Sequence, residues 1–276
     1  MLLVQPLSDL PLVCTGRVQS NLYIGLTICS HMDQMRAIID TRSLCAIPAV
    51  LGPLTRAADF RPDAEGWTVF AYSAAGDRAV EVRLPANAFR EFCTPAPFSV
   101  DLLDLDRLCS MVKGPTDVEL EIGARIVARV DGVKVTIPTE PFEADSKKSP
   151  SKAAERMDFS AEAVVQPSRF SMLFKTSDLK AVDGCTVTLD DKGLTLDATN
   201  EDMGKGVAVT VPLEDITSDG AARAVYSLAG LKGLFAAVPG DPLCDMRFGT
   251  DYPLTMGFKV GYLDVLYLIA PRIESE

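Results

Sequence analysis

The sequence predicts an α+β protein made of two similar domains, and the first observation behind this prediction is an internal repeat. The segment EGWTVFAYSAAGDRAVEVRLP at 65–85 returns as KGLTLDATNEDMGKGVAVTVP at 192–212, an offset of 127 residues without a gap. The identical positions are Gly66/Gly193, Thr68/Thr195, Ala71/Ala198, Val80/Val207, Val82/Val209 and Pro85/Pro212. Further matches follow at an offset of 126: Leu102/Leu228, Leu105/Leu231, Leu108/Leu234, Val112/Val238, Gly114/Gly240 and Gly123/Gly249. A repeat of this length indicates a duplicated structural unit.

The second observation is the order of the elements within each copy. Segments with helical spacing of apolar residues alternate with runs of short segments in which apolar and polar residues alternate. Several strands in a row between two helices favour antiparallel sheets over a parallel sheet of βαβ units. Each copy therefore reads as strand, helix, strands, helix, strands.

In the first copy, we expect a short strand at 36–40 and a helix over 41–59. The helix has apolar residues at Leu44, Ile47, Leu51 and Leu54, although Pro48 and Pro53 weaken it. Strands at 67–72 and 79–84 flank a turn, and an amphipathic helix is expected over 98–112, ended by Gly114-Pro115. Alternating strands follow at 117–123 and 125–137.

In the second copy, a strand at 159–165 precedes a helix over 167–182, for which Ser168 is a candidate N-cap. A hairpin at 185–199 and a strand at 206–213 come next. A helix is expected over 226–238, followed by strands at 243–249, 254–260 and 265–271. The residues between the copies, 138–158, are rich in Pro, Ser and Lys and read as an extended connector.

Residues 1–34 differ from the rest because their apolar run is broken by Pro and charged residues. The segment lacks the order of a secretory signal: basic residues, a clean apolar run and small residues at a cleavage site. We expect translation to begin at Met35, with 1–34 an upstream mis-called start or an extension. The predicted organisation is therefore an extension (1–34), a first domain (35–137), a connector (138–158) and a second domain (159–276).

Composition restricts the possible function classes. The chain has 276 residues, a net charge of −11 and a pI of about 4.7, which argues against nucleic acid unless basic residues gather on one face. His31 is the only histidine, so metal sites built on histidine and catalytic triads lack their components. The seven cysteines form no CxxC pair and are expected to be reduced, small buried hydrophobes.

An enzyme is the first rival interpretation, and the sequence offers it little. The carboxylate pairs Asp190-Asp191, Asp104/Asp106 and Glu201-Asp202 are expected on solvated surfaces, and NEDMGKG (200–206) lacks the spacing of a phosphate-binding loop. No apolar run of about 20 residues predicts a membrane span. We therefore expect no catalysis, no cofactor, no metal and no membrane.

The C-terminal stretch DYPLTMGFKVGYLDVLYLIAPRIESE (251–276) resembles the end of DNA sliding clamps of the proliferating-cell-nuclear-antigen (PCNA) type. YLIAPRIESE is similar to that family's Y-L-A-P-[KR]-I-E ending, and Asp251, Pro253 and Leu254 match its Asp-x-Pro-Leu. The resemblance covers roughly 35–276, is strongest from Phe159 onward, and by length is closest to the archaeal branch.

The resemblance implies the processivity-clamp fold, in which antiparallel sheets lie outside and helices line a ring of three head-to-tail subunits around duplex DNA. By position, the subunits would pair through two strands, which contribute Val133, Val135 and Ile137 on one side and Val207, Val209 and Val211 on the other. Ordinary internal strands are the alternative for both. The expected DNA-facing residues, by helix, are Arg107, Lys113, Arg169, Lys175 and Lys232, with Arg42 and Arg56 flanking the first helix.

The resemblance also implies an outer pocket that takes short apolar motifs of DNA polymerase, clamp loader, ligase and nucleases. By alignment it would involve Tyr72, Gly76, Ala79, Phe142, Pro253, Leu268, Ile269, Ala270 and Pro271. The implied assembly is a homotrimer acting in replication and repair in the cytoplasm, at the nucleoid. A clamp-fold paralogue that binds partners without loading onto DNA remains the alternative, as does a heterotrimer.

Overall fold

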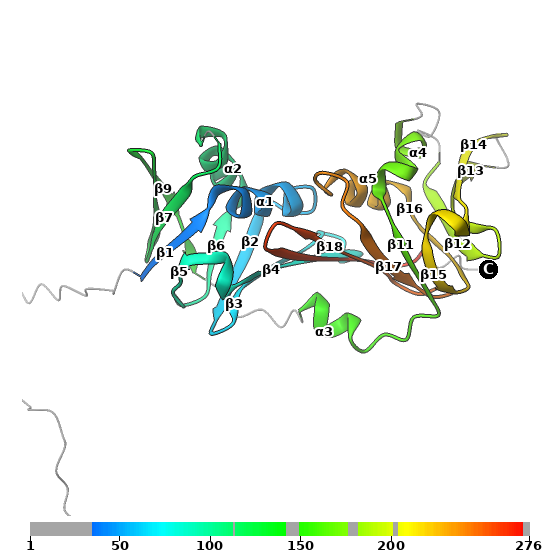
Figure 1. Ribbon diagram of the computed structural model, residues 1–276, viewed down its shortest axis with the longest axis horizontal. Coiled ribbons are helices and arrows are strands. Elements are labelled where there is room, and N and C mark those ends of the chain that lie inside the picture. The colour runs from blue at the N-terminus through cyan, green and yellow to red at the C-terminus, as the bar shows by residue number, and fades with distance from the viewer. Residues whose placement is uncertain (1–34, 113, 142–148, 176–181, 201–203, 273–276) are drawn as a thin grey trace, which may run out of the picture. The chain divides into compact units, whose positions relative to one another are not determined.

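The computed structural model describes residues 35–112, 114–141, 149–175, 182–200 and 204–272, which belong to one compact unit (Figure 1). The first half contains β1 (Met35–Asp40), α1 (Thr41–Leu51), β2 (Ala57–Asp63), β3 (Gly66–Tyr72), β4 (Arg78–Pro85), η1 (Ala86–Ala88), β5 (Phe89–Glu91), β6 (Phe98–Asp101), α2 (Leu102–Met111), β7 (Asp117–Ile122), β8 (Arg125–Val130) and β9 (Val133–Pro138). The connector contributes β10 (Glu140–Pro141) and α3 (Pro150–Ala154). The second half contains β11 (Ala161–Val165), η2 (Pro167–Phe170), α4 (Ser171–Lys175), β12 (Gly184–Asp190), β13 (Gly193–Asn200), β14 (Lys205–Val211), η4 (Leu213–Asp215), β15 (Thr217–Gly220), β16 (Ala222–Ser227), α5 (Leu228–Ala236), β17 (Cys244–Phe248), β18 (Leu254–Val260) and β19 (Leu263–Ile269).

These strands form three antiparallel sheets. Their strand orders are β5-β1-β7-β8-β9, then β10-β6-β2-β3-β4-β19-β18-β17-β11-β15, then β14-β13-β12-β16. The ten-stranded sheet spans both halves of the chain, because β4 pairs with β19 over six residues, from Asp264↔Arg83 to Ile269↔Arg78. The fold is thus α+β with antiparallel sheets, as the sequence predicted.

The internal repeat has matching geometry in its two copies. Gly66 and Gly193 each begin a strand at positive φ, +151° and +132°, where a Cβ atom would lie 2.1 Å from the carbonyl oxygen of Leu84 or Val211 respectively. The prolines that end each hairpin, Pro85 and Pro212, share φ −66° and ψ 154° and lead into a 3-10 turn. The shared glycines therefore mark positions where another residue would clash, and the shared prolines lie at the same point before each 3-10 turn. We keep the boundaries 35–137, 138–158 and 159–276 as a proposal.

The central part of the ten-stranded sheet is covered on both faces. On one face, here called the helix face, the Tyr267 hydroxyl of β19 donates to the Val50 carbonyl of α1. On the opposite face, the connector face, α3 packs against β4 and β19. Because side chains alternate along a strand, every residue of β4 and β19 can be assigned to one of these faces.

The two helices of the first half are shorter than the sequence predicted. α1 ends at Leu51, and the last three residues of the predicted helix, 57–59, belong to strand β2 instead. The predicted helix over 98–112 begins only at Leu102, because Phe98–Asp101 pair with β2 as strand β6. The Asp101 carboxylate then caps α2 by accepting from the Leu103 backbone N–H at 2.8 Å.

The helices of the second half are shorter as well. Of the predicted helix 167–182, the described part is a 3-10 turn followed by α4, and residues 176–181 lie outside the described residues. Ser168 is not the N-cap; its backbone N–H donates to Asp241 Oδ1 at 2.7 Å. The helix expected from 226 begins at Leu228, with the Ser227 hydroxyl accepting from the Gly230 N–H.

The cysteines depart from the expectation of free, buried thiols. Cys45 of α1 and Cys109 of α2 form a disulfide, with their Cα atoms 5.4 Å apart. Cys185 and Cys244 are buried and unpaired, as expected, whereas Cys93 is half-buried. The pair was missed because its members are 64 residues apart and meet only when the two helices pack together. Cys14 and Cys29 lie outside the described residues.

Candidate DNA-facing, partner-binding and edge-strand sites

The predicted DNA-facing residues lie on exposed helix surfaces, but two of them already have acidic partners. The Arg107 guanidinium lies 2.9 Å from the Asp104 carboxylate one turn earlier on α2. The Arg169 guanidinium lies 3.3 Å from the Asp215 carboxylate. Both pairs are substantially exposed, so each contributes little free energy and can be exchanged for another anion.

Lys175 and Lys232 are the freer cations of this set. Lys175 is the last residue of α4 and Lys232 lies in the middle of α5; both are exposed. In the described part of the chain, neither forms an ion pair. Lys113 lies outside the described residues.

Arg78 is a cation of the helix face that the sequence reasoning missed. It is paired with Ile269 at the start of β4, and its side chain lies against α5, because a Cβ at Gly230 would meet Arg78 Cδ at 3.3 Å. Its guanidinium also contacts Asp77 at 3.4 Å. No sequence signal could identify this position, since the contact depends on β4 and α5 meeting from opposite halves of the chain.

The Asp77 carboxylate is the anionic partner in this region. It accepts a hydrogen bond from the Ser73 hydroxyl at 2.5 Å. This hydrogen bond is the main reason that the pKa of Asp77 lies below its usual value. Burial opposes it with a smaller effect, and the nearby Arg78 lowers the pKa further. The same turn contains Gly76 at φ +71°, and the Ala270 N–H donates to the Asp77 carbonyl at 2.8 Å. The turn of the first half and the last strand are thus held together at one end of the sheet.

The connector face brings most of the predicted partner-binding residues together. Tyr72, Ala79 and Leu268 lie side by side on β3, β4 and β19, and Thr255 of β18 continues this row. Pro253, Ala270 and Pro271 are half-buried next to it in sequence. Ile269 is the exception: it points to the helix face and is buried in the core, so it cannot line a pocket on the connector face. Phe142 lies outside the described residues.

Glu81 anchors the connector to this face and was not predicted. It is only 3% exposed, in the middle of β4, yet its carboxylate has three donors from the connector. The Ser149 hydroxyl donates at 2.5 Å, the Ser151 backbone N–H at 3.1 Å and the Ser151 hydroxyl at 2.8 Å. We call Glu81, Ser149 and Ser151 the connector anchor. A buried carboxylate is stable only when it is paired or hydrogen-bonded in this way.

A groove runs beside α3 on the same face. Its volume is about 260 Å³, and it is lined by Ser151, Ala154, Glu155, Phe159, Asp245, Arg247, Thr255, Gly257 and Leu266. Leu266 and Thr255 are direct neighbours of the row that contains Leu268. The connector anchor therefore positions one wall of a groove that is continuous with the predicted partner-binding row.

The two strands expected to pair between subunits, β9 and β14, are both terminal strands of their sheets. Val135, Val207 and Val209 are half-buried, Val133 is 44% exposed, and Ile137 and Val211 face the core. A terminal strand has one row of backbone N–H and C=O groups free to pair with another chain. Pairing between chains stays a prediction.

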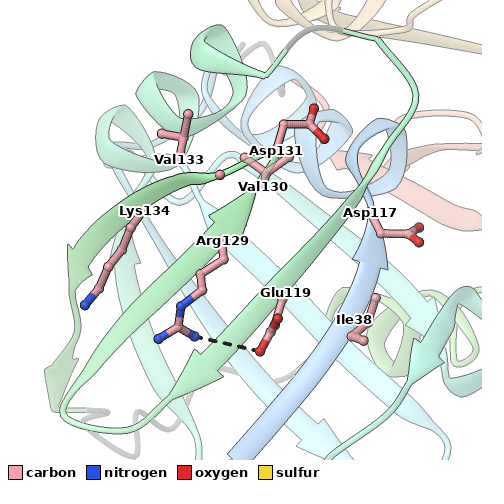
Figure 2. A pocket seen from close by; sticks show the side chains of 9 residues that line it. Ile38, Asp117, Glu119, Arg129, Val130, Asp131, Val133 and Lys134 are labelled. Atoms are coloured by element: carbon pink, nitrogen blue, oxygen red, sulfur yellow. Dashed lines mark ion pairs between the residues drawn. The ribbon is translucent and has the colours of Figure 1, made fainter.

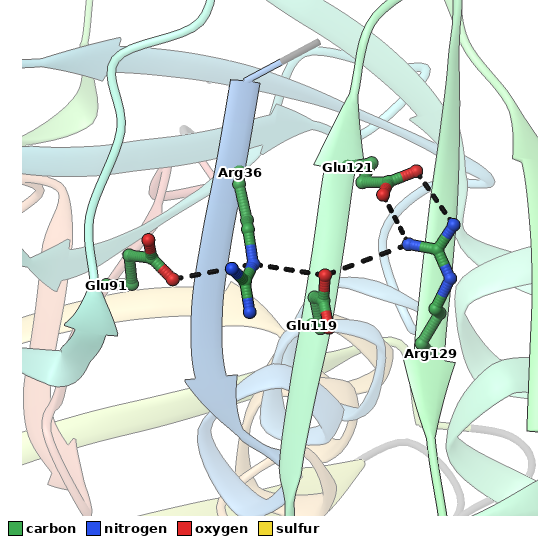
Figure 3. Close-up of polar contacts among 5 residues, drawn as sticks. All are labelled: Arg36, Glu91, Glu119, Glu121 and Arg129. Carbon is green, nitrogen blue, oxygen red and sulfur yellow. Dashed lines mark hydrogen bonds and ion pairs between the residues drawn. The ribbon is translucent and has the colours of Figure 1, made fainter. Parts of the chain in front are cut away.

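Next to β9, the outer surface of its sheet carries a chain of charged side chains (Figure 3). Arg36 lies 3.4 Å from Glu91 and 3.0 Å from Glu119, and Arg129 lies 3.7 Å from Glu119 and also pairs with Glu121. The hydrogen bond from Arg129 lowers the pKa of Glu121. Each of these charged side chains thus has a partner on a neighbouring strand, and the pairs link the four strands from β5 to β8.

A shallow pocket of about 540 Å³ lies at the end of β8 and β9, and Figure 2 shows that Glu119 and Arg129 of this network line it. Its lining includes Asp117, Asp131, Val133 and Lys134. Across the described residues, no group of three or more His, Cys, Asp or Glu side chains is arranged to hold a metal ion. None of the described helices is long and apolar enough to span a membrane.

Comparison with known proteins agrees with this geometry. No family model matches the chain. The DNA polymerase sliding clamp of Natronomonas pharaonis is 25% identical over 249 residues, covering 87% of this chain and 99% of the relative. Among solved structures, A. fulgidus PCNA bound to the C-terminal region of FEN-1 matches with a TM-score of 0.75 at 18% identity, covering 87% and 99%. The PCNA2–PCNA3 complex of Sulfolobus tokodaii matches with a TM-score of 0.70 at 18% identity, covering 86% and 99%.

The chain has the clamp fold. It is an α+β protein of antiparallel sheets, with β9 and β14 as terminal strands of two different sheets. Over 87% of its length the chain is similar to archaeal DNA polymerase sliding clamps of the PCNA family. Clamps of this family are not enzymes.

Proposed function

We propose that this protein is a sliding clamp that closes with two further subunits around duplex DNA and tethers DNA polymerase and other replication and repair proteins. The observation that carries the proposal is the position of β9 and β14, which end two different sheets of one clamp-fold chain. Two unlike open edges allow head-to-tail pairing, and a head-to-tail contact with the right rotation closes a ring. Such a clamp works at the nucleoid in the cytoplasm.

Side-chain chemistry at the two edges supports pairing between copies of this chain. On β14, Val207 and Val209 point toward the core side of their sheet, where they pair with buried Ala198 and Leu196. On β9, Val135 and Ile137 have the same orientation. An antiparallel contact would continue this apolar layer from one subunit into the next.

The DNA contact in this proposal is weak and independent of sequence. Arg78, Arg107, Arg169, Lys175 and Lys232 provide a few cations for phosphate, and the three arginines are shared with carboxylates. Phosphate contacts of this kind position a protein without reading the bases. A closed ring does not need strong contacts, because it is retained on DNA by its topology.

Partner proteins would bind on the connector face through short apolar motifs. The half-buried Tyr72 and Leu268 flank the buried Ala79 in this row, and together with Ala270 and the groove beside α3 they offer apolar surface with a polar rim. The A. fulgidus structure holds a region of FEN-1, a precedent for one kind of partner. A central apolar anchor surrounded by polar contacts is typical of small, specific interfaces.

Light scattering after size exclusion tests the assembly, and a loading assay on nicked circular DNA tests the function. We expect a mass near three chains and stimulation of polymerase by the loaded protein. A mass near one chain, with loading restored only by other clamp subunits, indicates a heterotrimer, as the two-component Sulfolobus complex illustrates. Peptide binding without any loading indicates the partner-binding paralogue.

A further inference from the structure

The disulfide between Cys45 and Cys109 joins two helices that are held to the protein very differently. Eight of the eleven residues of α1 are buried. Only Leu102, Leu105 and Leu108 of α2 are buried. The crosslink to α1 therefore adds to Leu105 and Leu108 in holding the middle of α2 in place.

The two ends of α2 have their own attachments. At its start, the Leu102 N–H donates to the Arg56 carbonyl at 2.7 Å. After its end, the Gly114 carbonyl accepts from the Thr41 hydroxyl at 3.0 Å, and the Thr41 N–H donates to the Thr116 carbonyl at 2.8 Å. Loss of the disulfide would consequently loosen the body of the helix without detaching its ends.

α2 also packs against β9, the open terminal strand. Val135 and Ile137 of that strand are the residues proposed to continue the apolar layer into the next subunit. If α2 moves more freely, the edge strand β9 that packs against it is also less ordered before it pairs. Subunit association must then order the strand, and the conformational entropy lost in doing so weakens the subunit contact.

Exposure separates this pair from two of the other described cysteines, Cys185 and Cys244, whereas Cys93 is half-buried like the pair. Because Cys45 and Cys109 are only half-buried, the pair is not enclosed in the core. Cys185 and Cys244 are fully buried, and burial raises the pKa of each thiol to about 12. Only thiolates attack disulfides, so the buried thiols are inert under the same conditions.

We propose that Cys45 and Cys109 form a redox site at which a low-molecular-weight disulfide sets the mobility of α2 and, through β9, the strength of the subunit contact. The Cys45 or Cys109 thiolate attacks the small disulfide and releases one small thiol. The second cysteine then attacks the mixed disulfide and releases the other. Two protein thiols and one small disulfide thus give one protein disulfide and two small thiols. The effect on the subunit contact rests on the proposed ring; the exchange site and the response of α2 do not.

The experiment compares the full-length protein equilibrated with oxidised glutathione and with a reducing dithiol. Peptide mapping without reduction identifies which cysteines are paired, and hydrogen exchange measures the backbone amides of α2. We expect a Cys45–Cys109 peptide in the oxidised sample only. We also expect α2 amides to exchange roughly tenfold faster after reduction, with β12 and β13 unchanged. Light scattering on dilution should show the reduced protein losing its three-chain mass at a higher concentration than the oxidised protein.

The double variant C45S/C109S should behave as the reduced protein in both buffers, and C93S, which changes a half-buried cysteine outside the pair, should respond as the wild type does. Equal exchange of α2 amides in the two redox states overturns the proposal, as does a different partner for Cys45. A single-chain mass in both states contradicts the ring, while the exchange data still decide on the redox site.

Discussion

Replacing Glu81 tests whether the connector anchor holds α3 on the sheet. The wild-type carboxylate accepts three hydrogen bonds, from Ser149 and twice from Ser151, at 2.5–3.1 Å. Hydrogen bonds to a charged group contribute about 1.5–3 kcal/mol each, but burying the carboxylate offsets part of the sum. Pro150 is the only buried residue of α3, so little else holds the helix. We expect Glu81→Ala to lower the free energy of opening of α3 by about 3 kcal/mol.

Glu81→Gln is the matched control, because it keeps the shape of the side chain and removes the charge. Its amide oxygen can accept from Ser149 and from the Ser151 N–H, while its NH₂ group can donate to the Ser151 hydroxyl. We expect a loss of about 1 kcal/mol, the difference between charged and neutral hydrogen bonds.

Hydrogen exchange of the Ala153 and Glu155 amides measures this opening directly, since both donate within the turns of α3. About 1.4 kcal/mol corresponds to a tenfold change, so exchange should become roughly 100-fold faster in Glu81→Ala and about fivefold faster in Glu81→Gln. Opening of α3 also removes one wall of the groove beside it. The affinity for a partner-derived apolar peptide should therefore fall more in Glu81→Ala than in Glu81→Gln. Wild-type exchange rates in Glu81→Ala would refute the anchor.

Three further predictions concern the edges, the helix surface and pH. Val209→Asp places a charge in the apolar layer of β14 and should reduce the light-scattering mass from about three chains to one, with circular dichroism unchanged. Lys175→Glu combined with Lys232→Glu should shorten the lifetime of the protein on circular DNA several-fold, whereas Lys259→Glu, on the connector face of β18, should not. The pKa of Asp77 is lower in the folded protein than its value of 3.8 in the unfolded chain. The resulting stability is fully present above pH 3.8 and is lost as the pH falls through the folded-state pKa. Asp77→Asn should therefore flatten the decline in melting temperature below about pH 4.

The features that the sequence predicted well are those fixed by local chemistry. Gly66 and Gly193 occupy backbone conformations that other residues rarely adopt, and Pro85 and Pro212 end the following strands, so the repeat is visible without any structure. Strand alternation likewise located β3, β4, β12 and β13 to within one or two residues. Helix lengths were overestimated because apolar spacing alone cannot show that 98–101 pairs with β2.

The candidate sites were predictable only in part, because they depend on contacts between distant segments. The row of Tyr72, Ala79 and Leu268 followed from the resemblance, but the opposite orientation of Ile269 required the register of β19 against β4. The connector anchor joins residues 68 and 70 positions apart, and nothing in the run AVEVRL distinguishes Glu81 from a solvated carboxylate. The contact of Arg78 with α5 and the Cys45–Cys109 disulfide depend on tertiary packing in the same way.

The net charge of −11 and a role on DNA are compatible because of where the charges are and how they are paired. Much of the charge on the first sheet is bound up in pairs among Arg36, Glu91, Glu119, Glu121 and Arg129, away from the helices. On the helices, Arg107 and Arg169 have exposed acidic partners, and exposed pairs of this kind are worth less than about 1 kcal/mol. A passing phosphate can therefore replace either carboxylate at little cost and leave again as easily. Many unpaired cations would hold the proposed ring at one place on the duplex, so a small number of cations, several of them weakly paired, suits a ring that is retained on DNA by topology.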